Sequence, residues 1–368
     1  MKKIRLGDVA TYVNGYAFKP ADRGNKGLPI IRIQDLTGNA YDLGFYDGAY
    51  PKQIEINNGD ILISWSASLG VYIWNQGKAL LNQHIFKVVF DKAEINKCYF
   101  VYAVKYNLNA MKSKAHGATM KHIVKKEFDN MLIPYPSLEE QEKIAVILSK
   151  VSQIIEQCQQ ALDKLDEIIK ARFVELFGGK GYPEDTLLDL CNIIDYRGKT
   201  PEKVEYGLPF ITAKNVKMHQ MNLEPREYIS KETYDNVMVR GFPKEGDVVF
   251  TTEAPLGNVC RIPHFDTEFY IGQRIVTMQT EKLEPIYLEY ALSSDDFKMK
   301  YMGKSSGSTV TGIRVRLLEQ LTIPVPPIDI QTQFAAFVKQ TDKSKVAVQK
   351  ALDEAQLLFD SLMQRYFG

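Results

Sequence analysis

Apolar residues recur at alternating spacings of four and three along residues 137–178 and again along residues 327–368. This is the heptad pattern of coiled-coil helices, whose apolar side chains gather in one seam. The sequence therefore predicts two long helices, the second of them interrupted at Lys345. The predicted seam residues are Ile144, Leu148, Val151, Ile155, Leu162, Leu165, Phe334, Val338, Leu352, Phe359 and Leu362.

The chain contains an internal duplication. Segments of the first half return in the same order in the second half, and the offset drifts from 180 residues to 190. From Gln83 and Gln273 onward we expect a constant offset of 190. Ordered matches of this kind indicate two copies of one structural element. The matching segments are 28–30 with 208–210, 59–62 with 246–249, 117–119 with 307–309, 133–136 with 323–326, and Gln141 with Gln331.

Each copy begins with a region that mixes strand and helix signals. Gly59-Asp60 and Gly246-Asp247 precede short β-type runs, and residues 99–104 and 287–292 have the pattern of short helices. These regions predict α+β domains. The expected organisation is domain 1 (1–136), a first spacer helix (137–178), domain 2 (179–326) and a second spacer helix (327–368).

A lone helix would leave its apolar stripe exposed, so we expect the two long helices to pair with each other. Because the first helix leads into domain 2, and domain 2 leads into the second helix, an antiparallel pair closes the chain most simply. The predicted fold is two globular α+β domains separated by an antiparallel coiled coil. Further apolar positions beside the seam, expected to be exposed, are Ile147, Ile154, Ile168, Phe337 and Leu358.

The composition is that of a globular protein, with 45% hydrophobic and 25% charged residues in 368. No apolar run reaches the ~18 residues that span a bilayer, and no signal peptide is evident, so a cytoplasmic location is expected. The net charge is +1, so a nucleic-acid surface would have to come from local segregation of charge.

Motifs for catalysis and metal binding are missing from the sequence. The four cysteines lie far apart, and the histidines have no metal-ligand spacing. Residues 177–181 fit the glycine loop of S-adenosylmethionine methyltransferases, but they end a predicted helix instead of leaving a strand. A linker is the better interpretation. We therefore expect no catalytic residue, no metal and no cofactor in this chain.

Two windows of the chain are basic and contain no acid, at residues 96–126 and 298–318. Their matching positions in the two copies favour contact with phosphates. A solvated basic helix and loop is the alternative. The predicted contacts to a DNA backbone are Lys112, Lys114, Gly117, Thr119, Lys121, Lys125, Lys304, Ser305, Ser308, Thr309, Arg314 and Arg316.

With these features, the chain resembles the specificity subunit of type I restriction–modification enzymes over essentially its whole length. The resemblance rests on the duplication and on residues 117–141 and 307–331, which carry a "P-P-x-x-E-Q" element at each junction of domain and helix. The element departs slightly from the family pattern: Tyr135 separates the first two prolines, and Ile330 stands in place of Glu.

The resemblance implies a non-catalytic subunit that binds double-stranded DNA. Each domain would be a target recognition domain reading one half of a bipartite sequence. The helix pair would set the spacer and dock two methyltransferase subunits, and restriction subunits with translocase activity would join them. S-adenosylmethionine, and ATP with Mg, would bind to these partner subunits.

Base-reading residues are expected where the two domains differ. Gln and Asn suit adenine in the major groove, and Arg or Lys suits guanine. An ordinary surface role is the alternative for each candidate, and Trp65 is expected in the core. The candidates are Gln34, Asp35, Ser66, Gln83, Lys214, Asn215, Thr252, Glu253, Gln273 and Arg274.

Two other functions remain open at this point. One is a single-chain DNA methyltransferase whose motifs have diverged. The other is a coiled-coil scaffold without a role on DNA, in which the basic windows bind an acidic protein.

Overall fold

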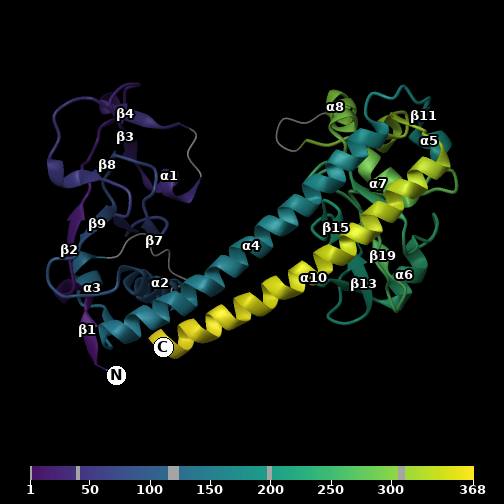
Figure 1. Cartoon of the computed structure of the whole chain (residues 1–368). Coiled ribbons are helices and arrows are strands. Elements are labelled where there is room, and N and C mark those ends of the chain that lie inside the picture. Colours follow the sequence, from purple (N-terminus) through teal and green to yellow (C-terminus); the bar gives the residue numbers. More distant parts are fainter. Residues whose placement is uncertain (1, 39–41, 115–123, 197–200, 306–310) are drawn as a thin grey trace. The chain divides into compact units, whose positions relative to one another are not determined.

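The chain divides into two compact units. The structure, a computed structural model, describes residues 2–38, 42–114, 124–196, 201–305 and 311–368. Unit 1 combines Met1–Gln160 with Gln349–Gly368, and unit 2 is the continuous segment Ala161–Val348. Each unit holds one α+β domain and parts of two long helices, α4 (Leu138–Phe177) and α10 (Ile328–Phe367) (Figure 1). The predicted fold class is confirmed.

Domain 1 is built on two four-stranded sheets. The first is antiparallel, in the order β2-β9-β6-β7, and the second has the order β4-β3-β8-β5 with β3 and β8 parallel. A short antiparallel ladder pairs β1 with β10. The strands are β1 (Lys3–Arg5), β2 (Thr11–Asn14), β3 (Leu28–Ile31), β4 (Gly44–Tyr46), β5 (Glu55–Ile56), β6 (Ile61–Ser64), β7 (Gly70–Ile73), β8 (Ala79–Leu81), β9 (Ile85–Val89) and β10 (Leu132–Pro134). The helices are α1 (Ile33–Thr37), α2 (Lys97–Lys114) and α3 (Lys125–Asp129).

Domain 2 repeats this plan. Its main sheet is antiparallel, in the order β12-β20-β17-β18, and β13 pairs in parallel with β19 and antiparallel with β16. Short ladders join β11 to β21 and β14 to β15. The strands are β11 (Glu184–Thr186), β12 (Asn192–Asp195), β13 (Leu208–Ile211), β14 (Val216–Lys217), β15 (Gln220–Met221), β16 (Tyr228–Ile229), β17 (Val248–Thr251), β18 (Val259–Arg261), β19 (Tyr270–Ile271), β20 (Ile275–Gln279) and β21 (Thr322–Pro324). The helices are α5 (Leu187–Leu190), α6 (Lys231–Val237), α7 (Pro285–Ser293), α8 (Asp295–Lys304) and α9 (Val315–Leu318).

The parallel strand pair shows the duplication directly. Ile30 lies opposite Leu80 in domain 1, and Phe210 lies opposite Tyr270 in domain 2. The first members of these pairs differ by 180 positions and the second members by 190, which reproduces the drift seen in the sequence.

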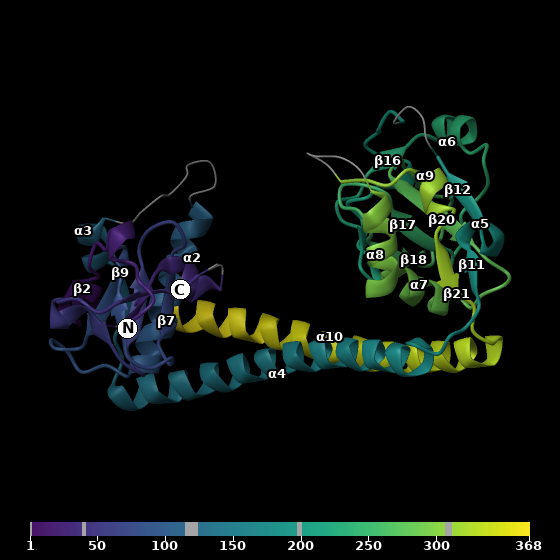
Figure 2. The same ribbon diagram turned by 90° about the horizontal axis from the view of Figure 1, so that it is seen from above.

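The helix beside the main sheet differs between the copies. In domain 1 it is the single helix α2, whereas in domain 2 it is divided at Ser294 into α7 and α8. The Ser294 side chain accepts a hydrogen bond from the Phe297 backbone and so starts α8 as an N-cap. Helix α7 lies beside β17 and β18 (Figure 2), and the ring of Phe297 in α8 lies 6.2 Å from that of Phe250 in β17.

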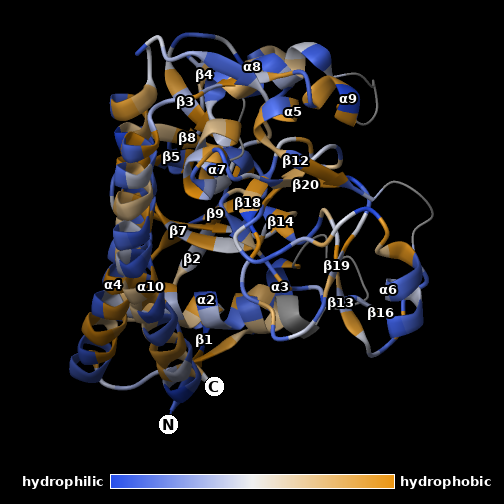
Figure 3. Cartoon of the chain, turned by 90° about the vertical axis from the view of Figure 1, so that its right-hand side faces the viewer, coloured by the Kyte–Doolittle hydropathy of each residue, from blue (hydrophilic) through white to orange (hydrophobic). Residues whose placement is uncertain are grey.

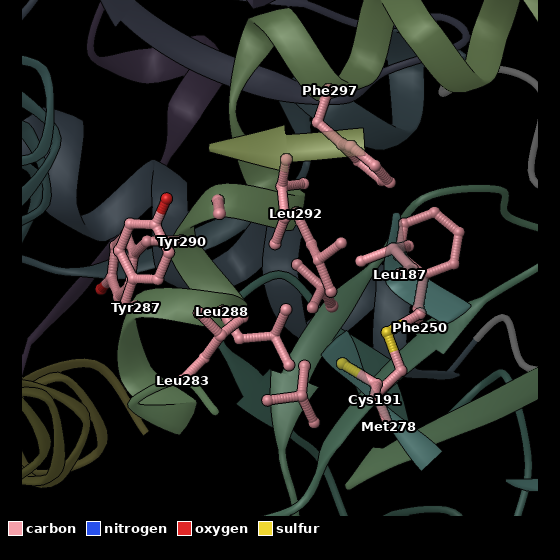
Figure 4. Packing of buried hydrophobic residues seen from close by; sticks show 14 of the residues in the cluster. Leu187, Cys191, Phe250, Met278, Leu283, Tyr287, Leu288, Tyr290, Leu292 and Phe297 are labelled. Atoms are coloured by element: carbon pink, nitrogen blue, oxygen red, sulfur yellow. The ribbon is translucent and has the colours of Figure 1, made fainter. Parts of the chain in front are cut away.

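The core of unit 2 fills the space between this sheet and these helices. Phe250 of β17, Leu288 of α7 and Phe297 of α8 are almost fully buried in one cluster, shown in Figure 4. In unit 1 the equivalent cluster contains Tyr99 and Phe100 of α2. Burial of such aromatic side chains supplies much of the driving force for folding.

Within each unit the two long helices contribute to the same hydrophobic cluster. In unit 1, Leu148 from the first half of α4 shares a cluster with Phe359 from the second half of α10. In unit 2, Ile169 from the second half of α4 shares a cluster with Phe334 from the first half of α10. The helices therefore run antiparallel in both units.

The predicted seam residues all lie on the covered side of these helices. Both helices carry apolar residues (orange) and hydrophilic ones (blue) along their length in Figure 3. Ile144, Leu148, Val151, Phe334, Val338 and Phe359 are buried, and Ile155, Leu162, Leu165, Leu352 and Leu362 are half-buried. Lys345, which interrupts the pattern, places its Nζ 2.5 Å from an oxygen of Asp166.

A buried glutamine fastens each domain to the helix that follows it. Gln141 accepts a hydrogen bond from the Asn96 backbone (3.0 Å) and donates one to the Pro136 carbonyl (2.9 Å). Gln331 repeats both contacts, with Glu284 (2.9 Å) and Pro326 (2.7 Å). The glutamine of the "P-P-x-x-E-Q" element thus has a structural role.

A tyrosine makes a second repeated contact at the same joint. The hydroxyl of Tyr99 donates to the Pro134 carbonyl (3.0 Å), and that of Tyr287 donates to the Pro324 carbonyl (2.6 Å). The tyrosines differ by 188 positions and the prolines by 190. The expectation of a constant offset from Gln83 onward is therefore wrong. Between the tyrosine and the proline of this contact, domain 2 has two residues more than domain 1.

Candidate nucleic-acid interface

In domain 2 the structure brings four of the predicted base-reading residues together. Thr252 and Glu253 follow β17, and Gln273 and Arg274 lie between β19 and β20. The Thr252 backbone donates to the Arg274 carbonyl (2.8 Å). The Arg274 guanidinium lies 2.7 Å from a carboxylate oxygen of Glu253, with 56% and 42% of the two side chains exposed. We call residues 252–253 and 273–274 the domain 2 edge.

One end of the second basic window lies against this edge. The Ile313 backbone donates to the Thr252 carbonyl (2.9 Å), and Gly312 forms an isolated β-bridge with Glu253. Arg314 follows directly, at the N-terminus of α9, and its side chain is exposed. A predicted phosphate contact and predicted base readers are therefore neighbours in domain 2.

The other predicted contacts of this window are only partly described. Arg316 is exposed on α9, and Lys304 is exposed at the end of α8. Ser305 donates its hydroxyl to the Met302 carbonyl (2.8 Å), so it closes α8. Ser308 and Thr309 lie outside the described residues.

Domain 1 has an equivalent edge made of Trp65, Ser66, Gln83 and His84. Trp65 follows β6, and its backbone donates to the carbonyl of His84 between β8 and β9 (3.2 Å). The two rings meet edge-on with centroids 4.8 Å apart, and the indole N–H donates to the Asn14 side chain (3.2 Å). We call residues 65–66 and 83–84 the domain 1 edge. Trp65 is half-buried and packs against the core, as expected.

The first basic window contributes less to the described structure. Lys125 pairs with Asp129 (2.8 Å) and lies 6.0 Å from the Tyr12 ring, so its charge is already compensated. Lys112 and Lys114 belong to the last turn of α2. Gly117, Thr119 and Lys121 lie outside the described residues.

Two predicted base readers do not fit that role. Asn215 is 1% exposed, and its amide bonds to Thr212, Asn222 and Pro225, so it holds a loop together. Asp35 is paired with Arg32 (3.0 Å) and accepts the Arg32 backbone N–H at the start of α1. Their donors and acceptors are used within the domain, which leaves little for a base.

The remaining candidates lie outside the two edges or are covered. Gln34 on α1 and Lys214 in the loop after β13 are exposed, but neither belongs to an edge. Thr252 is only 9% exposed and contributes chiefly its backbone. The sequence prediction missed His84, although it follows the candidate Gln83 and stands 190 positions before the candidate Arg274.

A metal-binding cluster and a membrane-spanning helix are both missing from the part of the chain that the structure describes. Among these residues no three His, Cys, Asp or Glu side chains are grouped to hold a metal ion. None of the described helices is long and apolar enough to cross a membrane.

Comparison with known proteins defines the class. The sequence model of the family described as "Type I restriction modification DNA specificity domain" matches residues 1–167 and 180–355, one match for each copy. The chain belongs to this family. The predicted role, a DNA-recognition subunit and not an enzyme, is confirmed by this membership.

Individual relatives agree with this assignment. The chain is 26% identical to the type I restriction enzyme EcoBI specificity subunit of Escherichia coli, over 98% of this chain and 83% of that one. It is 27% identical to the MjaVIII specificity subunit of Methanocaldococcus jannaschii, over 95% and 89% of the two chains. The crystal structure of a type I S subunit from M. genitalium has the same fold, with a TM-score of 0.61, 15% identity, and coverage of 100% and 96%.

Proposed function

We propose that this chain reads a bipartite sequence in double-stranded DNA, with one half-site for each domain. The observation that carries the proposal is the pair of equivalent edges. Each edge is built from the end of an equivalent strand (β6 or β17) and from an equivalent turn (before β9 or β20). The side chains differ: Trp65 and His84 form a ring contact in domain 1, and Glu253 and Arg274 form an ion pair in domain 2. A shared scaffold with different side chains suits two different half-sites.

The test is base-resolution mapping of methylated DNA in a host that carries the complete restriction–modification system. The expected result is a target of two specified parts separated by unspecified positions. A single continuous target would contradict the proposal. Sequence discrimination that persists with a steep salt dependence would also separate this function from that of a scaffold without a role on DNA.

The helix pair sets the length of the unread spacer in this proposal. Support comes from the joints at Gln141 and Gln331, which tie each domain to its helix by two hydrogen bonds. A change in helix length is then transmitted to the domains and not absorbed by a loose linker.

The spacer is tested by inserting seven residues after Gln160 and seven after Val348, the two boundaries between the units. Both units keep all their residues, and a heptad preserves the seam. Each helix grows by about 10 Å, which corresponds to about three base pairs. The half-sites should stay the same while the spacer lengthens. An unchanged spacer would show that the helices do not measure it. The control, an insertion after Gln160 alone, should disrupt the pair.

The helix pair also docks two methyltransferase subunits, and restriction subunits with translocase activity join the complex. Exposed apolar side chains beside the seam support this: Ile147, Ile154, Ile168 and Leu358 are between 41% and 50% exposed. Phe337 was expected in this set, but it is half-buried against the unit 2 core and contacts the Arg172 guanidinium. Ile154→Glu with Leu358→Glu should abolish co-purification with the methyltransferase, whereas Lys164→Glu, also exposed on α4, should not.

Cofactors belong to the partner subunits in this proposal. S-adenosylmethionine binds to the methyltransferase subunits, ATP with Mg binds to the restriction subunits, and the complex works in the cytoplasm. Incubating the purified chain with S-adenosylmethionine and DNA should give no methyl transfer until a methyltransferase subunit is added. Transfer by the chain alone would favour the diverged methyltransferase.

A further inference from the structure

The two edges share an unusual backbone conformation. His84 and Arg274 both have a left-handed backbone, with φ of 72° and 70°, and they are equivalent under the 190-residue offset. Ala67 and Ala254, equivalent under an offset of 187, also have positive φ, of 54° and 49°. Few residues other than glycine adopt this region, because their Cβ crowds the backbone. Both copies therefore have a residue with a side chain at positions where the backbone conformation favours glycine.

In each domain a neighbour across the edge braces this left-handed residue. The backbone at Trp65 and at Thr252 donates to the carbonyl of His84 and Arg274, respectively (3.2 and 2.8 Å). The side chains are braced by different chemistry: the Trp65 ring meets the imidazole, and the Glu253 carboxylate pairs with the guanidinium. The brace is thus common to both domains, while the braced group differs.

The turn in domain 1 also contains buried polar atoms without hydrogen-bond partners. The side-chain oxygen of Asn82 and Nδ1 of His84 are buried without a hydrogen-bond partner. Buried polar atoms in native proteins are almost always paired, so an unpaired one calls for an explanation. Strain and unpaired polar atoms in one short turn are typical of a binding site.

We propose that His84 and Arg274 are the specificity-determining residues of the two domains, each contacting a base edge in the major groove, with Trp65 and Glu253 as positioning residues. The assignment rests on the proposed bipartite reading. An arginine donates two hydrogen bonds to O6 and N7 of guanine, so the half-site of domain 2 should contain a guanine read by Arg274. Because Nδ1 of His84 is buried, only Nε2 can reach a base, so His84 makes a single hydrogen bond where Arg274 makes two.

The decisive variants are Arg274→Gly and His84→Gly in the assembled complex. Glycine relaxes the left-handed backbone, so both variants should fold at least as well as the wild type. Selection from a DNA library randomised in both half-sites measures the preference at each position. Arg274→Gly should reduce guanine discrimination in one half-site by about 5- to 150-fold and leave the other unchanged. His84→Gly should relax one position in the other half-site.

The positioning role of Glu253 has its own readout. Glu253→Gln should weaken discrimination at the same guanine by less than Arg274→Gly does. The double variant should behave like Arg274→Gly alone, because Glu253 acts through Arg274. Arg274→Lys keeps the charge without the two-pronged geometry and should recover only part of the discrimination.

Arg226→Ala is the matched control, because Arg226 is an exposed arginine of domain 2 that pairs with Glu224 (2.9 Å) but has no left-handed backbone. It should leave both half-sites unchanged. Wild-type preferences in both glycine variants would overturn the assignment, as would an equal change in Arg226→Ala. A wild-type complex without a two-part preference would instead overturn the bipartite function itself, and no variant is needed to see it.

Discussion

The helix pair is held together by different chemistry in the two units. In unit 1 the seam is apolar at Ile155, and α2 contacts α10 through a neutral hydrogen bond from Tyr106 to Gln364 (2.7 Å). In unit 2 the position equivalent to Ile155 is Lys345, which lies 2.5 Å from Asp166 and 3.8 Å from Asp342. At this one seam position the scaffold therefore has an apolar residue in unit 1 and an ion pair in unit 2.

The charged contacts in unit 2 continue from the helices into domain 2. Asp342 lies 3.7 Å from Arg261 of β18, and Arg261 pairs with Glu289 of α7 (2.5 Å). Glu289 is 1% exposed and also contacts His219 (2.8 Å). Although burial lowers it, the pKa of Arg261 is raised overall by the Glu289 carboxylate. In domain 1 the residue equivalent to Glu289 is Val101, which is apolar and half-buried.

The joint between domain and helix pair is therefore built in two ways. An apolar contact tolerates small shifts of the packed elements. A buried charge is stable only when its oppositely charged partner stays within bonding distance. We therefore expect the joint of domain 2 to be stable in only one arrangement of domain and helices. The stability of the joint of domain 1 should depend on apolar packing. Four experiments test this comparison.

The largest effect is expected where the two units are alike. Ile144 and Phe334 are equivalent, 3% and 0% exposed, and both lie in the helix seam. Ile144→Ala should cost about 2–5 kcal/mol and Phe334→Ala about 3–5 kcal/mol. Hydrogen exchange should show that each loss is confined to its own unit. Leu357→Ala, at a 74% exposed position, is the control. Equal losses in both units would contradict their independence.

The second test removes the buried carboxylate of the charged joint. Glu289→Gln keeps the shape but leaves Arg261 without its closest anion, so unit 2 should lose about 3 kcal/mol. This is the lower end of the usual range, because Arg261 is 31% exposed. Glu224→Gln, at a 66% exposed ion pair, should change the stability by less than about 0.5 kcal/mol. A tolerated Glu289→Gln would mean that packing alone holds this joint.

The third test exchanges the seam residues between the copies. Lys345→Ile should change the stability of unit 2 by less than about 1 kcal/mol, because Asp166 is 55% exposed and can return to water. Ile155→Lys should cost unit 1 about 1–2 kcal/mol, since Gln356 stands where Asp166 does in the other copy. Denaturation of each variant at low and high salt checks both values. A strong salt dependence of unit 1 in the wild type would contradict the comparison.

The smallest effect concerns thiol reactivity. Cys98 of α2 is exposed, whereas burial raises the pKa of Cys260 in β18 to about 12. At pH 8 a thiol with this pKa has only about one thiolate in 10,000 molecules, and its burial slows alkylation further. Maleimide should therefore label Cys98 first. Labelling of Cys260 should accelerate in Glu289→Gln, and an unchanged rate would indicate that the joint has not loosened.

The periodic and repeated features of this fold could be predicted from the sequence. The seam at Leu148 and Val338 follows from the heptad spacing, which depends only on residues close together in the chain. The duplication likewise identified Gln141 and Gln331, although not their hydrogen bonds. Lys345 was recognised as an interruption, but its partner Asp166 lies on the other helix and could not be deduced.

The site was less predictable, because polar residues have many uses. Asn215 and Asp35 have the chemistry of base readers, but local hydrogen bonds occupy them. The 190-residue offset relates His84 to the candidate Arg274, but the left-handed backbone that the two residues share leaves no mark in the sequence. The contact between Arg261 and Glu289 depends on tertiary packing that brings β18 against α7.

Unit 1 is assembled from two separate segments of the chain, which has a consequence for folding during synthesis on the ribosome. Unit 2 is one continuous segment, so it is complete as soon as residue 348 has emerged. Unit 1 is begun earlier but needs Gln349–Gly368, whose Phe359, Met363 and Phe367 fill its core. The half that is translated first therefore finishes folding last. Until then the nascent chain presents the uncovered faces of Leu148 and Tyr99, which is where a chaperone or an early partner would act.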